Sequence, residues 1–316
     1  MDIGAILAVV ALTAVFYNNH FVLLLLATVL VYATACLGLN VQFGYAGMLN
    51  FAGAAMLGVG GYTAAVLGSY SSFPTILILP AGGIMTALVG CLLLPPMLRT
   101  YGHYSAVVTI AFGLLFTTFL ELNGSLGGPQ GLNVRSASVL GWSLNENYQF
   151  SGLSIAFYVN YVAVALALLI IVAVFVRRLE RSWIGLNLDA VRLDETASRC
   201  FGINIGLWKT VAFSAGNFIA GLAGAFYALM LGYISPSNFT FGDSLILVTV
   251  ILLGGLGSIW GVILTAAIVI ILPEKLQAIQ EYRILLYAIV VALTILFRPD
   301  GLIPRAPRKY FVGGCL

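Results

Sequence analysis

The first residues able to do chemistry are three amide side chains set among glycines in an otherwise apolar stretch. Asn40, Gln42 and Asn50 carry the amides, and Gly38, Gly44 and Gly47 lie around them. Irregular backbone survives at membrane depth only beside protein or a water-filled cavity, so the run predicts a broken helix whose second half begins near Asn50. The N–H groups and positive dipole end of that half-helix would suit a carboxylate. A purely structural role, with the glycines as close helix contacts, is equally compatible.

Residues near this break are the candidates for lining a path through the chain. One threonine in the apolar segment 104–122 is a further candidate. The candidate path residues are Gln42, Gly44, Tyr45, Gly47, Asn50 and Thr109.

A charged loop is the second candidate site. Ten of the chain's 14 basic and 11 acidic residues fall between Arg177 and Lys209, and long apolar segments flank this loop on both sides. A membrane protein that concentrates its charge in one loop presents that loop to a partner or to the solvent.

Part of the loop, Leu186 to Gly202, predicts one short amphipathic helix. Asn187 or Asp189 would cap its start and Gly202 would end it. The pattern fits a solvated or membrane-surface element as well as a docking helix for a cytoplasmic protein. Apolar side chains recur at positions i, i+4, i+7 and i+8, on one face; these are Leu193, Ala197, Cys200 and Phe201.

Composition identifies the elements that must position these residues. Hydrophobic residues make up 61% of the 316-residue chain and charged residues 8%, against about 25% charged in soluble domains. Residues 3–98 contain no Asp, Glu, Lys or Arg. Continuous apolar runs of about 20 residues match helices crossing a bilayer, so we expect an all-α polytopic membrane protein forming a single domain, 1–316. A net charge of +3 without a basic stripe disfavours nucleic acid.

Eight to ten transmembrane helices are expected, with a broken or re-entrant element among them. Basic loop residues mark the cytoplasmic side, so loop 177–209 and the C-terminus are expected inside and loop 123–152 outside. Four crossings between Lys209 and Arg298 would keep these two residues on the same side of the membrane. The N-terminus is then expected in the cytoplasm, and we expect it to be retained as a first helix. The apolar segments are 3–17, 21–40, 48–68, 76–98, 104–122, 153–176, 209–233, 243–256, 259–272 and 284–297.

The segment after Lys209 carries small residues at every fourth position. Such a ladder allows another helix backbone to approach closely, so a packing seam is favoured over a role in lining a path. Its members are Ala212, Gly216, Ala220, Gly224 and Ala228.

Several chemistries lack the residues that they need. The four cysteines are far apart and form no CxxC or Cys/His pairing, so neither a metal site nor a disulfide framework is expected. No GxxxxGK[ST] motif is present. No carboxylate pair or nucleophile–base pairing stands at useful spacing, and no ionisable residue lies clearly in mid-span, as ion-coupled transporters usually require. We therefore expect neither an enzyme nor a resident cofactor.

Ordered sequence blocks throughout the chain resemble one known family. The loop sequence Ala190 to Asn204 resembles the coupling-loop motif of bacterial ABC-importer permeases of the LivM type, which carry branched-chain amino acids. Further blocks match in the same order: Gly38–Asn40 with Gly44–Gly47, Val108–Gly113, Gly127–Leu132, Gly221–Ala225, Ser235–Pro236, Leu253–Gly261 and Phe297–Leu302. Together these blocks are specific, whereas any one alone would be weak.

The resemblance implies a subunit of a heteromeric importer in the bacterial plasma (inner) membrane. Its expected partners are a homologous second permease, two ATPase subunits that bind the ATP, an extracytoplasmic binding protein and the lipid bilayer. The loop helix would sit in a groove on an ATPase. Residues implied in this ATPase coupling are Ala190, Arg192, Asp194, Glu195, Ala197, Arg199 and Gly202.

The expected function is then uptake of branched-chain, hydrophobic amino acids. Dipoles in place of net charges along the path would suit a zwitterionic, apolar substrate that must enter and leave readily. One alternative is a permease for urea, short amides or another small polar solute. A less favoured alternative is an ion-coupled secondary transporter.

Overall fold

A computed structural model of the chain describes most of the sequence. The described residues are 13, 19–70, 74–100, 104–134, 138–139, 142–143, 148–150, 153–155, 157–275, 282–298, 301–303 and 305. The expected first segment, 3–17, lies outside the described residues except for Thr13.

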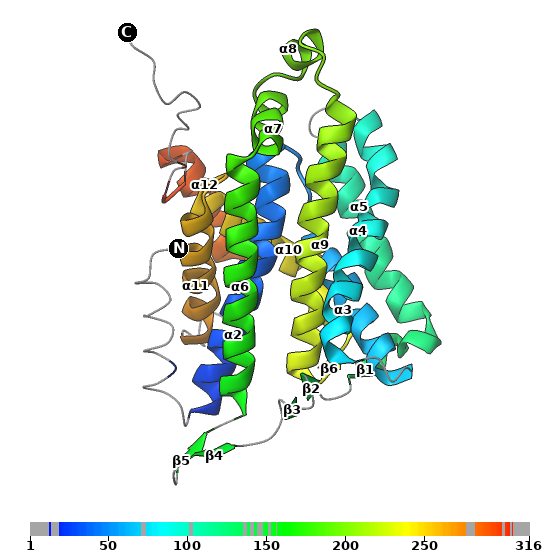
Figure 1. Ribbon diagram of the computed structural model, residues 1–316, viewed down its shortest axis with the longest axis vertical. Helices are drawn as coiled ribbons and strands as arrows, with labels where there is room; N and C mark the ends of the chain where they lie inside the picture. Colours follow the sequence, from blue (N-terminus) through cyan, green and yellow to red (C-terminus); the bar gives the residue numbers. More distant parts are fainter. Residues whose placement is uncertain are drawn as a thin grey trace.

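Helices dominate the described residues (Figure 1), as the sequence predicts. Continuous apolar sequence forms them because intrahelical hydrogen bonds satisfy the backbone where water is absent. The helices are α2 (His20–Asn40), α3 (Gly53–Tyr70), α4 (Thr75–Arg99), α5 (Tyr104–Leu122), α6 (Tyr158–Arg181), α7 (Trp183–Leu193), α8 (Glu195–Cys200), α9 (Ile205–Leu231), α10 (Phe241–Gly254), α11 (Ile259–Lys275) and α12 (Arg283–Phe297).

Within the described residues, six helical segments are long and apolar enough to cross a membrane. They are His20–Tyr45, Thr75–Arg99, Tyr104–Leu122, Tyr158–Arg181, Ile205–Leu231 and Pro236–Gly254, and Ile259–Leu272 is a shorter apolar helix. The prediction of an all-α polytopic membrane protein is therefore confirmed.

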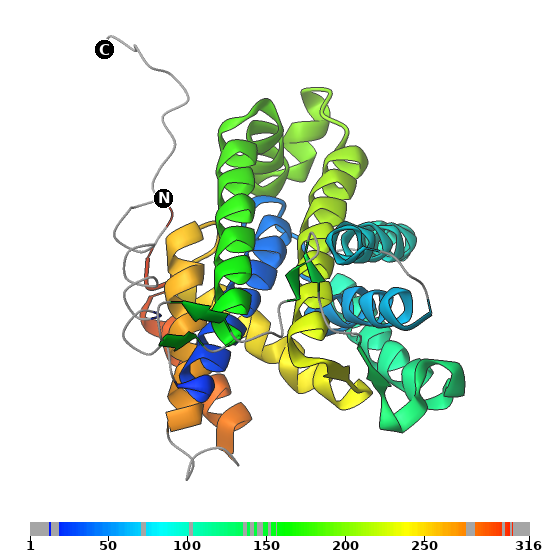
Figure 2. The same cartoon turned by 60° about the horizontal axis from the view of Figure 1, so that its bottom comes forward.

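Helix α9 occupies the middle of the bundle and packs on α2, α3 and α4. Both ribbon views place α4 and α5 on one side of it and α11 and α12 on the other (Figures 1 and 2). The small-residue ladder makes this packing possible. A Cβ at Gly38 of α2 would stand 2.6 Å from the Gly216 carbonyl oxygen, and one at Gly224 would overlap the carbonyl of Leu57 in α3. The packing seam predicted from the ladder is thus present.

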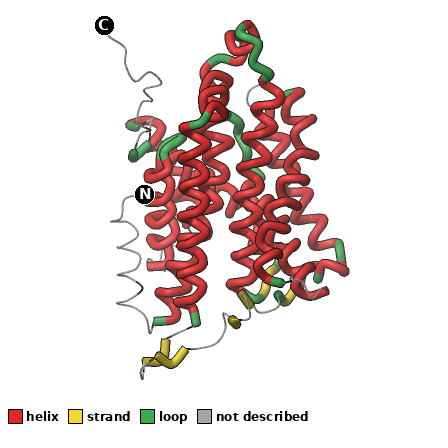
Figure 3. Tube along the Cα trace, in the orientation of Figure 1, coloured by secondary structure: helices red, strands yellow, loops and turns green. Residues whose placement is uncertain are grey.

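The short strands among the described residues lie at one end of the bundle (Figure 3). β1 (Leu132–Asn133) pairs with β6 (Tyr233–Ile234), and this links the long loop after α5 to the end of α9. The remaining ribbons join β2 (Ser138–Val139) to β3 (Trp142–Ser143) and β4 (Tyr148–Phe150) to β5 (Leu153–Ile155). Helices α7 and α8 stand at the opposite end (Figure 1), so β1 to β4, within the segment 123–152, lie at the opposite end of the molecule from the charged loop.

Candidate functional site

The predicted helix break is present. Helix α2 continues into a π-helical turn, η1 (Val41–Tyr45), and residues 46–52 are not helical. Gly47 has φ +66°, a left-handed conformation that glycine adopts without steric cost. The second half-helix, α3, begins at Gly53, three residues after Asn50, and Asn50 Oδ1 accepts a hydrogen bond from the Ala52 backbone N–H at 2.9 Å.

The amide side chains at the break form a buried chain of hydrogen bonds. Asn50 Nδ2 donates to Gln42 Oε1 at 2.7 Å, and Gln42 Nε2 donates to Asn217 Oδ1 of α9 at 2.9 Å. Gln42 Nε2 also donates to the Phe213 carbonyl at 3.2 Å. All three amide residues have no exposed surface, so the chain ties both sides of the break to the middle of α9.

The start of α3 does not offer all of the free N–H groups expected from sequence. Phe51 N donates to Thr109 Oγ1 of α5 at 3.0 Å, and Ala54 N donates to Ser244 Oγ of α10 at 3.0 Å. With the Asn50 cap, side-chain oxygens therefore occupy three of these donors. An N-terminus left open for a carboxylate was a wrong expectation at residues 51, 52 and 54, because neighbouring hydroxyls and an amide complete those bonds.

The break also holds the turn between α10 and α11. Asn40 Oδ1 accepts from Gly257 N at 2.9 Å, and the Tyr45 hydroxyl donates to the Gly257 carbonyl at 3.0 Å. Gly257 has φ +81°, which favours glycine at this turn. Two distant glycine-rich runs of the sequence are therefore a single structural unit.

The charged loop forms two helices, so the single helix predicted over Leu186–Gly202 is wrong. Asp194 lies between them, with extended backbone, and its Oδ1 accepts from Thr196 N at 2.7 Å and Ala197 N at 3.0 Å. These are the bonds of an N-cap. The predicted caps have other partners, since Asn187 donates to the Trp183 carbonyl and Asp189 bonds Arg305.

Gly202 ends the second helix as predicted. Its φ is +79°, and the bonds from Gly202 N to Arg199 O and from Ile203 N to Ser198 O are those of a Schellman motif. Glu195, in the first turn, pairs with Lys209 of α9 at 2.6 Å. This pair connects α8 to the helix that follows it.

The apolar face of the loop is uncovered. Leu193 and Phe201 are 85% and 86% exposed, and Ala197 and Cys200 are exposed as well. Burial of apolar surface is the main source of packing energy, so the face contributes nothing to this chain's own core. Ala190 in α7 is half-buried, and Arg199 in α8 is exposed.

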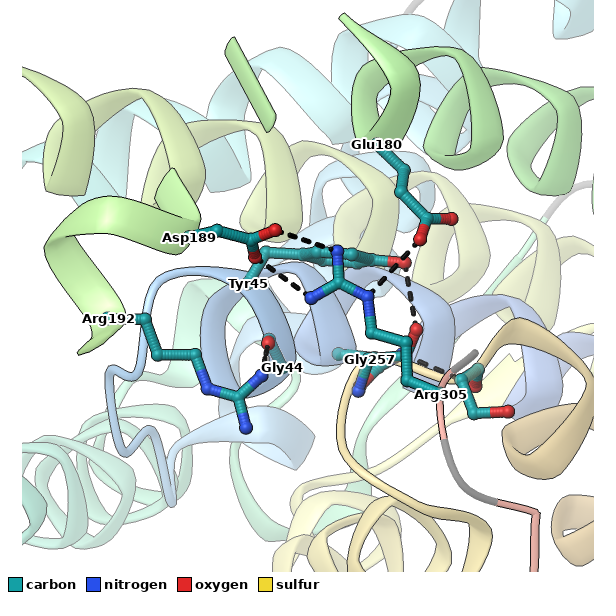
Figure 4. Close-up of polar contacts among 9 residues, drawn as sticks. Gly44, Tyr45, Glu180, Asp189, Arg192, Gly257 and Arg305 are labelled. Atoms are coloured by element: carbon teal, nitrogen blue, oxygen red, sulfur yellow. Dashed lines mark hydrogen bonds and ion pairs between the residues drawn. The ribbon is translucent and has the colours of Figure 1, made fainter. Parts of the chain in front are cut away.

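Arg192 differs from the other predicted coupling residues because it reaches into the break. Its guanidinium donates to the Gly44 carbonyl (Figure 4). A Cβ at Gly47 would stand 3.3 Å from Arg192 Cγ. Predicted loop residues and predicted path residues therefore meet at this point.

A second arginine completes what we call the loop-end cluster, formed by Tyr45, Glu180, Asp189, Arg192 and Arg305. Arg305 donates to Asp189 through both terminal nitrogens, at 2.8 and 3.1 Å, and to Glu180 at 3.2 Å (Figure 4). Its guanidinium carbon lies 4.6 Å from the centre of the Tyr45 ring. The cluster joins the ends of α6 and α7 to the break and to the C-terminal segment.

The pKa values of Arg192 and Arg305 are shifted in opposite directions. Burial lowers the pKa of Arg192, and the Arg305 cation lowers it further. Burial also acts to lower the pKa of Arg305, but the hydrogen bonds and charge of Asp189 outweigh this and raise it overall. Arg305 is thus the member held by the acidic side chains, while Arg192 is left to bond a neutral carbonyl.

Sequence reasoning missed Asn217, Glu180 and Arg305 as site residues. Asn217 interrupts an apolar helix between ladder positions Gly216 and Ala220, and a lone amide at mid-span is a signal that could have found it. Glu180 and Arg305 belong to no motif of the sequence. Their pairing spans 125 residues, so no local pattern reveals it.

A bundle of membrane-length apolar helices, broken beside a buried amide chain and bearing a capped charged loop at one end, defines a multi-pass membrane protein. Its family follows from comparison with known proteins. The chain belongs to the family described as branched-chain amino acid transport system / permease component, whose model matches residues 21–297.

Curated relatives agree with this family. The chain is 32% identical over 289 residues to the high-affinity branched-chain amino acid transport system permease protein LivM of Escherichia coli, covering 87% of this chain and 68% of that one. The LivM protein of Salmonella typhimurium gives the same identity and coverage. A probable branched-chain amino acid transport permease protein LivM of Methanocaldococcus jannaschii is 26% identical, covering 87% of this chain and 91% of its own. No solved structure matches.

Proposed function

We propose that this chain is the transmembrane permease subunit of an ABC importer that moves branched-chain amino acids across the bacterial inner membrane. The family and the relatives' names support the substrate class. The chain would not hydrolyse ATP itself. Two partner ATPases would supply the energy, beside a homologous second permease and an extracytoplasmic binding protein.

One observation carries the ATPase partnership: the uncovered apolar face of α7 and α8. Leu193 and Phe201 project from a helix pair that is capped at Asp194 and closed at Gly202. A rigid, capped helix with exposed apolar side chains suits insertion into a groove of another protein. We place this end and the C-terminus in the cytoplasm, in line with the six basic residues between Arg177 and Lys209.

Contacts behind the face supply a route for coupling. Arg192, at the end of α7, holds the Gly44 carbonyl at the break, and Glu195 holds Lys209 at the start of α9. A displacement of the loop by a partner would therefore reach both the break and the central helix. Alternating access follows if these two elements change position together.

Reconstitution tests the proposal. The chain, its second permease and the ATPases are purified together, placed in liposomes and supplied with the binding protein, and leucine uptake is measured with and without ATP. We expect uptake only with ATP and binding protein. Uptake driven by an ion gradient without the ATPases, or ATP-driven uptake of urea or short amides but not leucine, would overturn the proposal.

A loop variant tests the docking role separately. Gly202→Val removes the left-handed residue that ends α8, and we expect loss of ATPase co-purification. Gly232→Val is the matched control, because Gly232 ends α9 with φ +69° at the far end of the bundle and likewise has open space around it. Equal ATPase recovery from the two variants would contradict docking through α8.

A further inference from the structure

The buried amide chain at the break has a fixed direction. It starts at the Ala52 backbone N–H, which can only donate, so the atom of Asn50 that faces it must be the oxygen. The Asn50 nitrogen then faces the Gln42 oxygen, and the Gln42 nitrogen faces the Asn217 oxygen. Turning any one amide over would set two donors or two acceptors against each other.

This direction leaves the side-chain nitrogen of Asn217 as an unused donor at the end of the amide chain. Asn217 Nδ2 has no hydrogen-bond partner among the described residues, and the residue has no exposed surface. An unpaired buried donor is costly in an apolar interior. The structure thus holds, near the middle of its central helix, a group that gains free energy from any acceptor oxygen that reaches it.

The unpaired nitrogen lies between α9 and α4. It packs directly on Gly90 of α4, where a Cβ would overlap it. Glycines continue along this seam: a Cβ at Gly82 would stand 2.8 Å from Ala225 Cβ, and one at Gly83 would stand 2.8 Å from the Phe218 ring. Separating the two helices along this seam would uncover the donor.

An apolar cluster adjoins the same seam. It combines Ala220 of α9 with Ala52, which precedes α3, and with side chains of α3, α4 and α5, which are Ala55, Met56, Leu93, Phe112 and Phe116. Ala220 follows Asn217 by three residues, and Leu93 follows Gly90 by three, so each lies one turn along the same helix face. A neutral donor therefore stands beside an apolar surface.

We propose that Asn217 is a substrate-binding residue whose side-chain nitrogen takes a carboxylate oxygen of the transported amino acid when α4 separates from α9, with the apolar cluster taking the aliphatic side chain. This rests on the proposed function and names the group that recognises the substrate. A neutral donor without a counter-charge suits a site that must release what it binds. Gly90 is required because a larger residue would displace the amide.

Uptake by a matched pair of variants tests the proposal. Asn217→Leu keeps similar volume and removes the donor together with the oxygen that accepts from Gln42, whose nitrogen keeps its bond to the Phe213 carbonyl. We expect leucine uptake per assembled complex to fall about tenfold or more, the value of one hydrogen bond to a charged group. Thr265→Val is the control, because Thr265 Oγ1 in α11 is also buried without a partner in the described part of the chain but lies outside the amide chain and the cluster. Unchanged uptake in Asn217→Leu, or an equal loss in both variants, would overturn the assignment.

Cysteine labelling keeps the test decisive if Asn217→Leu fails to assemble. In a complex whose native Cys36, Cys91, Cys200 and Cys315 are replaced by alanine, Asn217→Cys is treated with a small water-soluble thiol reagent. We expect labelling during ATP turnover, reduced severalfold by leucine and not by urea. A thiol unreactive in every nucleotide state, or equally reactive with and without leucine, would refute the site. Failure of the proposed function is distinct, since it would show as no leucine uptake by the unmodified complex.

Discussion

Arg305 offers the sharpest test of the loop-end cluster. Its side chain is 16% exposed, and those of Asp189 and Glu180 are 18% and 19% exposed. Arg305→Met keeps most of the side-chain volume and leaves both carboxylates without this partner. Removing one side of a buried ion pair costs about 3–5 kcal/mol, and the residual exposure places the expected loss at about 3 kcal/mol, at the lower end of that range.

Thermal unfolding of the purified chain in nanodiscs, followed by intrinsic fluorescence, measures this loss. At about 2 °C per kcal/mol for a chain of this size, we expect the Tm of Arg305→Met to fall by about 6 °C. Arg305→Lys keeps the charge but loses the planar fork that bonds Asp189 at two points, so its Tm should lie between those of Arg305→Met and the unmodified chain.

A triple variant separates the lost contact from the cost of the two remaining charges. Adding Asp189→Asn and Glu180→Gln to Arg305→Met removes both carboxylate charges, and we expect recovery of about half of the lost Tm because their desolvation cost disappears. A Tm of Arg305→Met within about 1 °C of that of the unmodified chain would refute the reasoning, because this shift corresponds to a stability loss below about 1 kcal/mol. A triple variant no more stable than Arg305→Met would refute it as well.

Three further predictions concern the loop and the seam. Arg192→Met removes the bond from α7 to the break, so we expect the assembled complex to hydrolyse ATP with severalfold less uptake per ATP; an unchanged ratio would contradict transmission through this bond. Leu193→Ser with Phe201→Ser should abolish ATPase co-purification while shifting Tm by less than about 1 °C, because both side chains are exposed; normal co-purification would contradict a docking face. Gly224→Ala should lower Tm by about 4–6 °C, or about 2–3 kcal/mol, because its methyl group overlaps a backbone carbonyl of α3. Gly113→Ala, which meets open space, is its control and should be neutral or stabilising.

The sequence predicts the class of fold well because the bilayer restricts the backbone to few solutions. Apolar runs of membrane length become helices whatever their neighbours are, and the ladder of small residues on α9 becomes a close seam because only such residues permit it. The break near Gly44 follows from the same rule. These features depend on local composition, which the sequence states directly.

Boundaries and partners within the site could not be predicted in the same way. Asp194 fits the charged face of a continuous helix, yet in the structure it caps a new one, since Asp competes for backbone N–H groups. Asn217 and Arg305 acquire their roles from contacts with residues more than 100 positions away. Such pairings depend on how the helices assemble, and periodicity carries no information about that.

Helix α9 runs without interruption from the charged loop to β6 at the opposite end. Its 27 residues make a rod about 40 Å long, at about 1.5 Å per residue. A tilt of roughly 5° therefore displaces one end relative to the other by about 3–4 Å. Its glycine contacts with α2, α3 and α4 lie near the middle of the helix, so α9 would tilt about that point. A displacement of the charged loop in one direction would then move the β6 end of α9 in the opposite direction.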